Sequence, residues 1–285
     1  MPINEAEGDG KNAAYWKQLE VLAKTVKELD PAHPTFTAVA GLQSDKAAGL
    51  NAHTPSLDFI GINTYAALNG LRGSLAKVGW RSPWVVTEYG PRGCWESPRA
   101  PWGAPIEQTS TEKAQFIRKA YQATIQPGGD CWGGYVFLWG QKQEATSTWF
   151  GIFTESGEST AVRDVMHEFW KRQPPTDHAP VLTRLISTAA KKEIAPNAEF
   201  TAQAEASDAD GDPLTYQWTI TAESAGRDDQ GRERITKPMP QCVIKVEATS
   251  ATFHAPEKPG HYRVHVQVTD NRKRAATGNF PIMVK

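Results

Sequence analysis

The sequence is short of cysteine, of net charge and of long hydrophobic runs. Its three cysteines, Cys94, Cys131 and Cys242, are widely spaced and match neither a metal-ligand spacing nor a redox pair. No apolar run approaches the roughly 18 residues that a membrane span needs. The formal net charge of −1 over 285 residues gives no reason to expect nucleic acid or a membrane as a partner. Redox, metal-cluster, membrane and nucleic-acid functions are therefore not indicated.

Residues 1–172 alternate between compact apolar runs and helical stripes. Strands are expected at residues 35–40, 57–62, 84–87 and 134–139, after a stub at 1–4. Helices are expected at 12–29, near 45–50, at 71–78, from 109 to about 121 and at 160–171. Strands that alternate with helices in this way indicate βα units on a parallel sheet. Cys94 would follow one strand and Cys131 precede the next, which argues against a disulfide between them.

The pattern changes after a proline-rich stretch at residues 173–180, which is expected to be a stiff linker. Residues 181–285 contain short runs separated by turn residues, and Trp218 is expected in their core. Strict alternation at 262–268 is typical of strands with one buried face. The remaining strands are expected at 200–206, 214–220, 242–246, 251–255 and 280–284. Such repeated short strands predict a β-sandwich.

Glutamates follow the ends of two expected strands. Residues 84–87 lead directly into Glu88, and Ile3 and Asn4 precede Glu5. Parallel barrels carry their catalytic groups at the carboxyl ends of the strands. Two carboxylates held in this way are what glycoside hydrolysis requires, one as acid and base and the other as nucleophile. For either glutamate taken alone, the simpler alternative is a solvated loop residue.

Further residues have the chemistry to contact a sugar. Asn4 is suited to hydrogen-bond a sugar hydroxyl, and Tyr65, near the end of a neighbouring strand, to orient Glu88. Aromatic faces can stack on sugar rings, and ten tryptophans are many for this length. The other candidates for substrate binding are Trp95, Trp102, Trp139, Gln141 and Lys142. Their alternative is structural: the loop tryptophans fix the long loop after Glu88, and the polar side chains are solvated.

These motifs carry a resemblance. Ile3-Asn4-Glu5, followed by Val86-Thr87-Glu88-Tyr89-Gly90, resembles the acid/base and nucleophile motifs of clan A retaining glycoside hydrolases, with a family 2-like (β/α)8 catalytic barrel as the best match. The resemblance implies that Glu5 is the general acid/base, Asn4 the contact to the sugar 2-hydroxyl and Glu88 the nucleophile. It places Tyr65 on barrel strand six and Trp139 on strand eight.

The resemblance covers residues 1 to about 172, so only strands four to eight of such a barrel are expected. The implied fold is α/β, a partial TIM barrel at 1–172, joined by the 173–180 linker to the sandwich at 181–285. An open half-barrel exposes apolar surface and sheet edges. The expected partners are therefore an oligo- or polysaccharide substrate and either the missing N-terminal barrel half or a second copy. The family implies a periplasmic or secreted protein, although no signal peptide is recognisable.

The second domain carries an acidic turn, Asp208-Ala209-Asp210-Gly211-Asp212-Pro213. It resembles the acidic loops of polycystic-kidney-disease-type and cadherin-like immunoglobulin folds. Oxygen ligands from Asp208, Asp210 and Asp212 could gather a structural Ca²⁺, while no cofactor is expected for catalysis. The alternative is an ordinary Asp/Gly/Pro turn between strands.

Two functions from different classes follow. The first is a retaining β-glycoside hydrolase, or a transglycosylase on the same site, which would be weak or inactive as a half-barrel. The second is a non-catalytic carbohydrate-binding or adhesion protein that works through its sandwich. Neither the sugar nor the linkage is indicated by the sequence.

Overall fold

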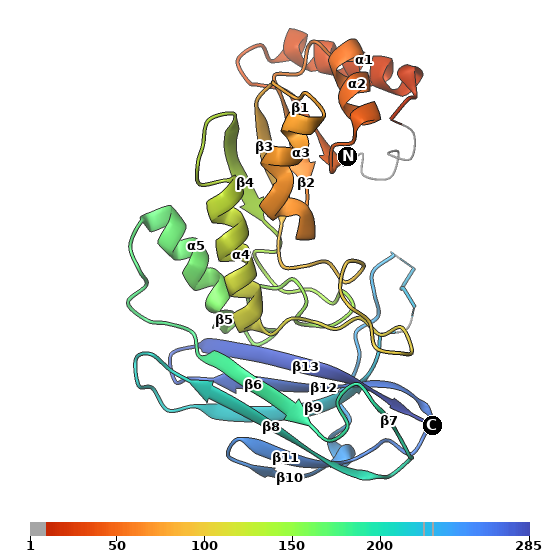
Figure 1. The fold of residues 1–285 in the computed structure, drawn as a ribbon, viewed down its shortest axis with the longest axis vertical. Helices are drawn as coiled ribbons and strands as arrows, with labels where there is room; N and C mark the ends of the chain where they lie inside the picture. Colours follow the sequence, from red (N-terminus) through yellow and green to blue (C-terminus); the bar gives the residue numbers. More distant parts are fainter. Residues whose placement is uncertain (1–9, 225, 230) are drawn as a thin grey trace. The chain divides into compact units, whose positions relative to one another are not determined.

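A computed structural model describes residues 10–224, 226–229 and 231–285 (Figure 1). Contacts divide the chain into two compact units. Unit 1 comprises the described residues up to Gly90 together with Arg118–Phe137, and unit 2 comprises Pro91–Ile117 and Leu138–Lys285. The strand stub expected at 1–4 lies outside the described residues.

Unit 1 is built on a parallel four-stranded sheet, as the alternating pattern predicts. Its strands β1 (Phe36–Ala40), β2 (Phe59–Asn63), β3 (Trp84–Tyr89) and β4 (Cys131–Val136) neighbour one another in chain order. Sequential parallel pairing of this kind is the arrangement of strands in a (β/α) barrel. The region is thus a partial, barrel-like β/α structure.

The fourth strand differs from its expected position. It begins at Cys131 and ends at Val136, whereas the sequence predicts 134–139. Gly133 and Gly134 act as strand residues here, because Gly134 faces the Tyr89 ring and Ile125 so closely that an added Cβ would lie 2.8 Å from the Ile125 Cδ1 atom. Gly134 is therefore needed for close packing, whereas Gly133 supplies a backbone φ of +146° that residues with a side chain rarely adopt.

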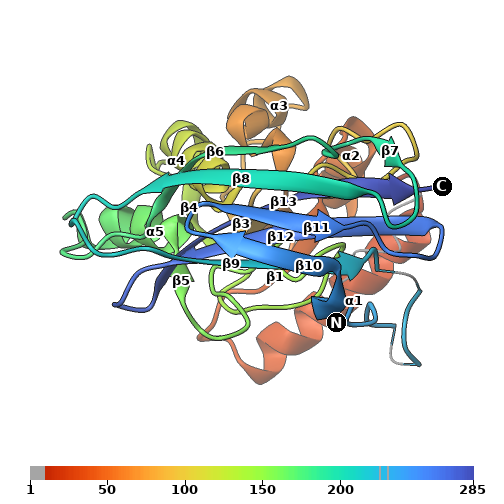
Figure 2. The same cartoon turned by 90° about the horizontal axis from the view of Figure 1, so that it is seen from below.

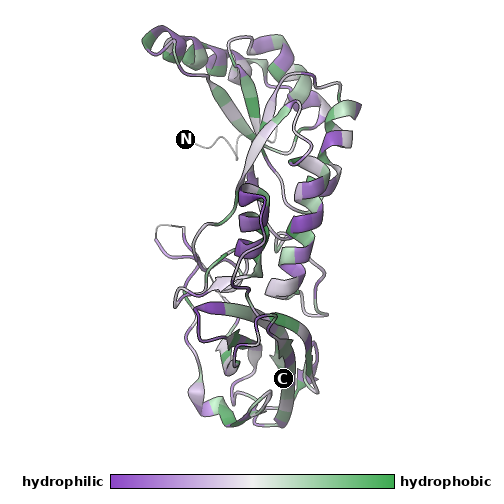
Figure 3. Ribbon diagram, turned by 90° about the vertical axis from the view of Figure 1, so that its left-hand side faces the viewer, coloured by the Kyte–Doolittle hydropathy of each residue, from purple (hydrophilic) through white to green (hydrophobic). Residues whose placement is uncertain are grey.

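Helices alternate with these strands, and their faces are mixed in hydropathy (Figure 3). Asn12 caps α1 by accepting a hydrogen bond from the backbone N of Tyr15 at 3.2 Å. Trp16 packs against Gly49, where any Cβ would lie 2.2 Å from its ring. The helices are α1 (Ala13–Leu29), α2 (Ser44–His53), the 3-10 turn η2 (Ala66–Gly70), α3 (Leu71–Lys77) and α4 (Ser110–Thr124).

In the described part of the chain, no helix combines the length and apolar character of a membrane span. Cys94, Cys131 and Cys242 are all free thiols, and burial raises the pKa of each.

Unit 2 contains an antiparallel β-sandwich (Figure 2). One sheet has the order β10-β11-β8-β6, and the other has β5-β13-β12-β9, with β7 paired to β13. The strands are β6 (Val181–Ser187), β7 (Glu193–Ile194), β8 (Glu199–Ser207), β9 (Thr215–Ala222), β10 (Val243–Glu247), β11 (Ser250–His254), β12 (Gly260–Thr269) and β13 (Arg274–Val284). The strands β6 and β7 were not expected, and β13 is longer than predicted.

The sandwich core follows the alternation of the sequence. Trp218 is 4 % exposed and packs edge-on against Phe253, with ring centroids 6.1 Å apart, so its expected core position is confirmed. Val264, Val266 and Val268 of β12 are fully buried in the same cluster. Core formation by one face of each strand is what fixes this register.

The stretch before the sandwich is part of the same unit. Strand β5 (Ser159–Thr160) pairs parallel with β13 at Arg274 and Ala275, and helix α5 (Ala161–Lys171) follows. Asp164 of α5 forms a buried ion pair with Arg274 and accepts a hydrogen bond of 2.8 Å from the backbone N of Ala179. Ala179, in the expected linker, is therefore held by a hydrogen bond to α5.

Candidate functional site

Glu88 lies at the carboxyl end of β3, at the edge of the sheet where parallel barrels carry their chemistry. Its backbone carbonyl accepts a hydrogen bond of 2.9 Å from the backbone N of Thr64. The pairing between β2 and β3 shifts register here, so that Asn63 stands opposite Glu88. Such an irregularity re-aims a side chain at the end of a strand.

The Tyr65 hydroxyl donates a hydrogen bond of 3.0 Å to Glu88 Oε2. Tyr65 is 8 % exposed and its ring packs edge-on against Phe137, so the phenol is held in place. Gly90 makes this position possible, because an added Cβ would lie 2.6 Å from the Phe137 carbonyl oxygen and 3.3 Å from the Tyr65 ring. In the Glu-Tyr-Gly motif, Glu88 thus provides the carboxylate, and Gly90 leaves the space that the ring of its hydrogen-bond donor, Tyr65, occupies.

Neighbouring side chains on the same strand ends fix the backbone. The Thr87 hydroxyl donates a hydrogen bond of 2.6 Å to Asn63 Oδ1 and packs against Gly61, where a Cβ would lie 2.5 Å from its methyl group. Tyr89 is fully buried, and burial raises the pKa of its hydroxyl.

The arrangement suits a nucleophilic carboxylate. Glu88 is half-buried, and one of its oxygens is oriented by a neutral donor. A charge-assisted hydrogen bond of this kind holds a carboxylate in one orientation without neutralising it. Glu5 and Asn4, the expected acid/base and 2-hydroxyl contact, lie outside the described residues.

The remaining expected sugar contacts belong to unit 2, whereas Glu88 and Tyr65 belong to unit 1. Trp95 is 55 % exposed beside Phe150, and Trp102 lies near His261. Trp139 follows β4 rather than ending it, and its ring contacts those of Phe153 and Trp170. Gln141 donates to the Ser147 carbonyl at 2.9 Å, and Lys142 pairs with Glu144 at 2.7 Å. Their roles in substrate binding stay predictions.

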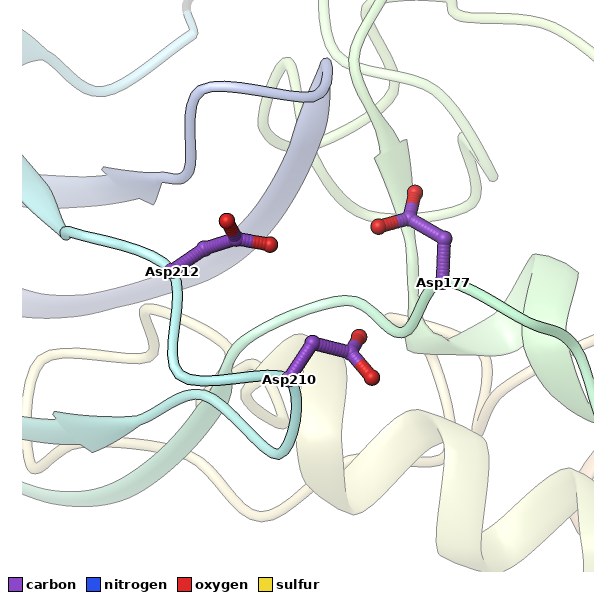
Figure 4. Close-up of side chains that lie close together, drawn as sticks. All are labelled: Asp177, Asp210 and Asp212. Carbon is purple, nitrogen blue, oxygen red and sulfur yellow. The ribbon is translucent and has the colours of Figure 1, made fainter.

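The acidic turn takes part in a cluster that the sequence only partly indicates. Carboxylate oxygens of Asp177, Asp210 and Asp212 lie within 4.8 Å of one another (Figure 4). Asp208 instead uses Oδ1 to accept hydrogen bonds from the backbone N of Asp210, at 2.8 Å, and of Asp212, at 3.2 Å. The third member is thus Asp177, which no local sequence pattern connects to the turn.

Protein cations already accompany these carboxylates. Arg272 lies 3.1 Å from Asp212 and 3.7 Å from Asp177, and His178 donates its backbone N–H to Asp210 at 2.7 Å. Burial and then the nearby Asp270 raise the pKa of Asp177, while hydrogen bonds from His178 lower that of Asp210. Calcium binding at this turn stays a prediction, with Asp177 as an added ligand candidate.

A second buried charge network was missed at the sequence level. Glu107 accepts hydrogen bonds from Thr146 Oγ1 and from Asn279 Nδ2, both at 2.6 Å, and forms a short contact with Lys113. Burial acts to raise the pKa of Glu107, but the Lys113 ammonium and the hydrogen bonds outweigh it and lower the pKa to about 2. These partners come from segments far apart in the sequence, so no local motif predicts their contacts.

Comparison with known proteins gives a family match for the C-terminal part of the chain only. Residues 185–280 match the family model described as the PKD domain. No curated protein matches the chain. The PKD domain of an M14-like peptidase from a Thermoplasmatales archaeon is 18 % identical over 38 % of this chain and 98 % of its own length, with a TM-score of 0.24.

Two longer structures are similar over nearly the whole chain. An α-L-arabinofuranosidase from Thermotoga maritima is 8 % identical over 95 % of this chain, with a TM-score of 0.40. A glycosyl hydrolase family 2 member from Bacteroides cellulosilyticus is 11 % identical over 98 % of it, with a TM-score of 0.36. The chain spans 62 % of the first protein and 48 % of the second.

Proposed function

We propose that this chain carries the nucleophile half of a retaining β-glycoside hydrolase, with Glu88 as the nucleophile. The observation that supports the proposal most is the hydrogen bond of 3.0 Å between Tyr65 and Glu88 at the carboxyl edge of a parallel sheet. A half-buried carboxylate with a fixed neutral donor is suited to attack a carbon and to leave again.

The reaction has two displacements. The Glu88 carboxylate attacks the anomeric carbon while the glycosidic C–O bond breaks, and the leaving oxygen takes a proton from the Glu5 carboxyl. Water then attacks the glycosyl ester, gives a proton to the Glu5 carboxylate and releases Glu88. Asn4 would hold the sugar 2-hydroxyl, and Tyr65 keeps the attacking oxygen oriented. The two carboxyl groups must come within about 5–5.5 Å of each other.

The roles can be tested by covalent trapping. A 2-deoxy-2-fluoro β-glycoside with a dinitrophenyl leaving group should label one carboxylate of the natural protein covalently. Mass spectrometry of a digest should place the label on Glu88. A label on another residue, or turnover with inversion of the anomeric centre, would remove the assignment.

Azide rescue distinguishes the two glutamates. Glu88→Ala should lose about 10⁴-fold or more in activity, and azide should restore turnover with the α-glycosyl azide as product. Glu5→Ala should instead give the β-glycosyl azide, because Glu88 still forms the intermediate. Glu28→Ala, on the exposed surface of α1, is the matched control and should keep its activity within about threefold.

A transglycosylase uses the same intermediate and differs only in its acceptor. Product analysis with and without an added sugar acceptor separates the two activities. The non-catalytic alternative predicts full binding of polysaccharide by Glu88→Gln and no turnover by the natural protein. An undiminished rate for Glu88→Gln would also reject the hydrolase proposal.

A further inference from the structure

Unit 2 has an open cavity of about 400 Å³ on the face of the β9-β12-β13 sheet that points away from the sandwich core. Its floor includes Thr219 of β9, His265 of β12 and Thr277 of β13. Residues 141–156 and 235–238 contribute the walls. A volume of this size lies within the range of about 300–1,000 Å³ that small-molecule sites occupy.

Both faces of this sheet are covered, one by the sandwich core and the other by residues 141–156 and 235–238. Val264 and Val266 point into the sandwich core, whereas Arg263, His265 and Gln267 alternate to the other side. Arg263 is 1 % exposed and donates hydrogen bonds to Asn279 Oδ1 at 2.6 Å and to the Pro105 carbonyl at 2.8 Å. The polar face of this sheet is therefore fixed by packing, as a rigid binding site requires.

The lining is rich in hydrogen-bonding groups and poor in charge. Hydroxyl and side-chain amide groups dominate it, and Glu155 is the one acidic residue among the described residues that line it. Burial and then the positive charge of Arg263 lower the pKa of His265 to about 4, so its imidazole is neutral at pH 7. A phosphate or a carboxylate ligand would find no positively charged side chain in the lining, and Glu155 offers a metal cation only a single carboxylate.

One donor in the cavity has no partner. Gln143 Nε2 is buried and makes no hydrogen bond among the described residues, although Gln143 lines the cavity. A buried donor without a partner is energetically unfavourable, because it has lost its hydrogen bond to water. A ligand acceptor placed beside this amide would restore a hydrogen bond.

The floor also discriminates between ligand classes. The backbone groups of β12 are paired on both sides, with β9 and with β13, so an extended peptide cannot add a strand there. Recognition must come from side-chain hydroxyls, amides and a neutral imidazole, each of which can donate or accept. A ligand that matches them has many hydroxyl groups and no charge.

We propose that this cavity is a second carbohydrate site, which binds one or two residues of a neutral oligosaccharide through hydrogen bonds. It is separate from Glu88 and requires no hydrolysis. Because no Phe, Tyr or Trp is among the described lining residues, we expect hydrogen bonding without stacking and a Kd on the order of 1 mM.

The test uses the whole chain with Glu88→Gln, so that hydrolysis plays no part. Cellobiose, xylobiose and maltose are titrated into protein labelled with ¹⁵N-histidine, and the His265 ring resonances are followed after assignment with His265→Gln. At least one disaccharide should shift them with a saturable curve. Triglycine and glucose 6-phosphate should not.

Two variants localise the binding. Gln143→Leu should weaken it at least tenfold, and Thr219→Phe, which fills the floor, should abolish it. Gln203→Leu, an exposed position of β8 in the other sheet, is the matched control and should leave the Kd unchanged. Thermal melts confirm that each variant is folded, and Tyr65→Phe should not alter this Kd.

The proposal is overturned if no disaccharide shifts His265 up to 50 mM, a concentration about fifty times the expected Kd. It is equally overturned if triglycine binds in their place, or if binding survives both Gln143→Leu and Thr219→Phe. If the fluoroglycoside does not label Glu88 but a disaccharide still shifts the His265 resonances, the hydrolase proposal is rejected and the proposal of a second carbohydrate site is kept.

Discussion

The carboxylate of Glu107 and the side-chain amide of Asn279 meet at 2.6 Å, although 172 residues separate them in the chain. Asn279 in turn accepts from Arg263 at 2.6 Å, which ties strands β12 and β13 to the segment before α4. Every member of this network is buried and has a partner. A network of this kind stabilises a fold only while it is complete.

Glu107→Gln should therefore destabilise unit 2 by about 3–5 kcal/mol, because Lys113 would keep its buried charge without a carboxylate, whereas Arg263 retains Glu223 at 2.8 Å. Denaturation with guanidinium chloride, followed by tryptophan fluorescence, measures the change. Glu199→Gln on the exposed side of β8 is the control, with an expected change within about 0.5 kcal/mol. Equal midpoints for the two variants would contradict the prediction.

His265 should make the stability depend on pH. Its pKa is lowered from 6.5 to about 4 by burial and by Arg263, against the opposing charge of Glu107. The unfolded chain therefore binds the proton first, so stability is full above about pH 6.5 and is lost as the pH falls to about 4.

Melting curves between pH 7 and pH 4 measure this effect. His265→Gln should flatten the decline above about pH 5, while Glu107, whose pKa is lowered from 4.5 to about 2, adds a further decline below about pH 5. A His265 ring that titrates near pH 6.5 in the folded protein would contradict the prediction.

Tyr65→Phe should lower kcat/KM of the proposed hydrolase by about 10–100-fold, because a hydrogen bond to a charged group contributes about 1.5–3 kcal/mol. The fold should persist, since the ring contact with Phe137 is retained. Tyr135→Phe, at an exposed position of β4, provides the control and should have the activity of the natural protein. A variant with undiminished kcat/KM would show that Glu88 needs no such donor.

Arg272→Gln should leave the acidic cluster without its nearest cation, so the melting temperature should fall by a few degrees at neutral pH. The calcium expectation is tested on this variant. If Asp177, Asp210 and Asp212 bind Ca²⁺, millimolar CaCl₂ should restore the melting temperature, whereas MgCl₂ should not. No difference between the two salts would argue against a calcium site.

The sheet of unit 1 exposes aromatic residues near the beginnings of its strands. Phe36 of β1 and Trp132 of β4 are 48 % and 56 % exposed, and Phe59 lies between them with ring centroids at 4.6 and 5.3 Å. Among the described residues, only β2 pairs with β1, and we expect this surface and the outer edge of β1 to be covered by a second copy of the chain.

Sedimentation of the chain should therefore show association that increases with concentration. Phe36→Lys combined with Trp132→Lys should shift the equilibrium toward the monomer, whereas Ile235→Lys in unit 2 should not. A natural chain that stays monomeric and does not bind a hydrophobic dye would argue that the surface needs no cover.

Periodicity predicted most elements of the fold, and pairing over long distances explains what it missed. The helical stripe of α1 and the alternation of β12 are local and were placed within a few residues. Strand β5 was not recognisable, because two residues become a strand only when Arg274 and Ala275 lie beside them. Likewise the contact between Tyr65 and Glu88 was expected from strand ends, whereas the positions of Asp177 in the acidic cluster and of Gln143 in the cavity depend on contacts that no neighbouring residue signals.

The pairing of β5 with β13 also has a consequence for synthesis. Because a ribosome makes β13 long after it has made β5, the segment around α5 has to wait for its partner strand. During that interval the Asp164 carboxylate has no Arg274 to pair with. Translation speed and chaperone access over the last hundred residues should therefore govern the yield of correctly assembled protein.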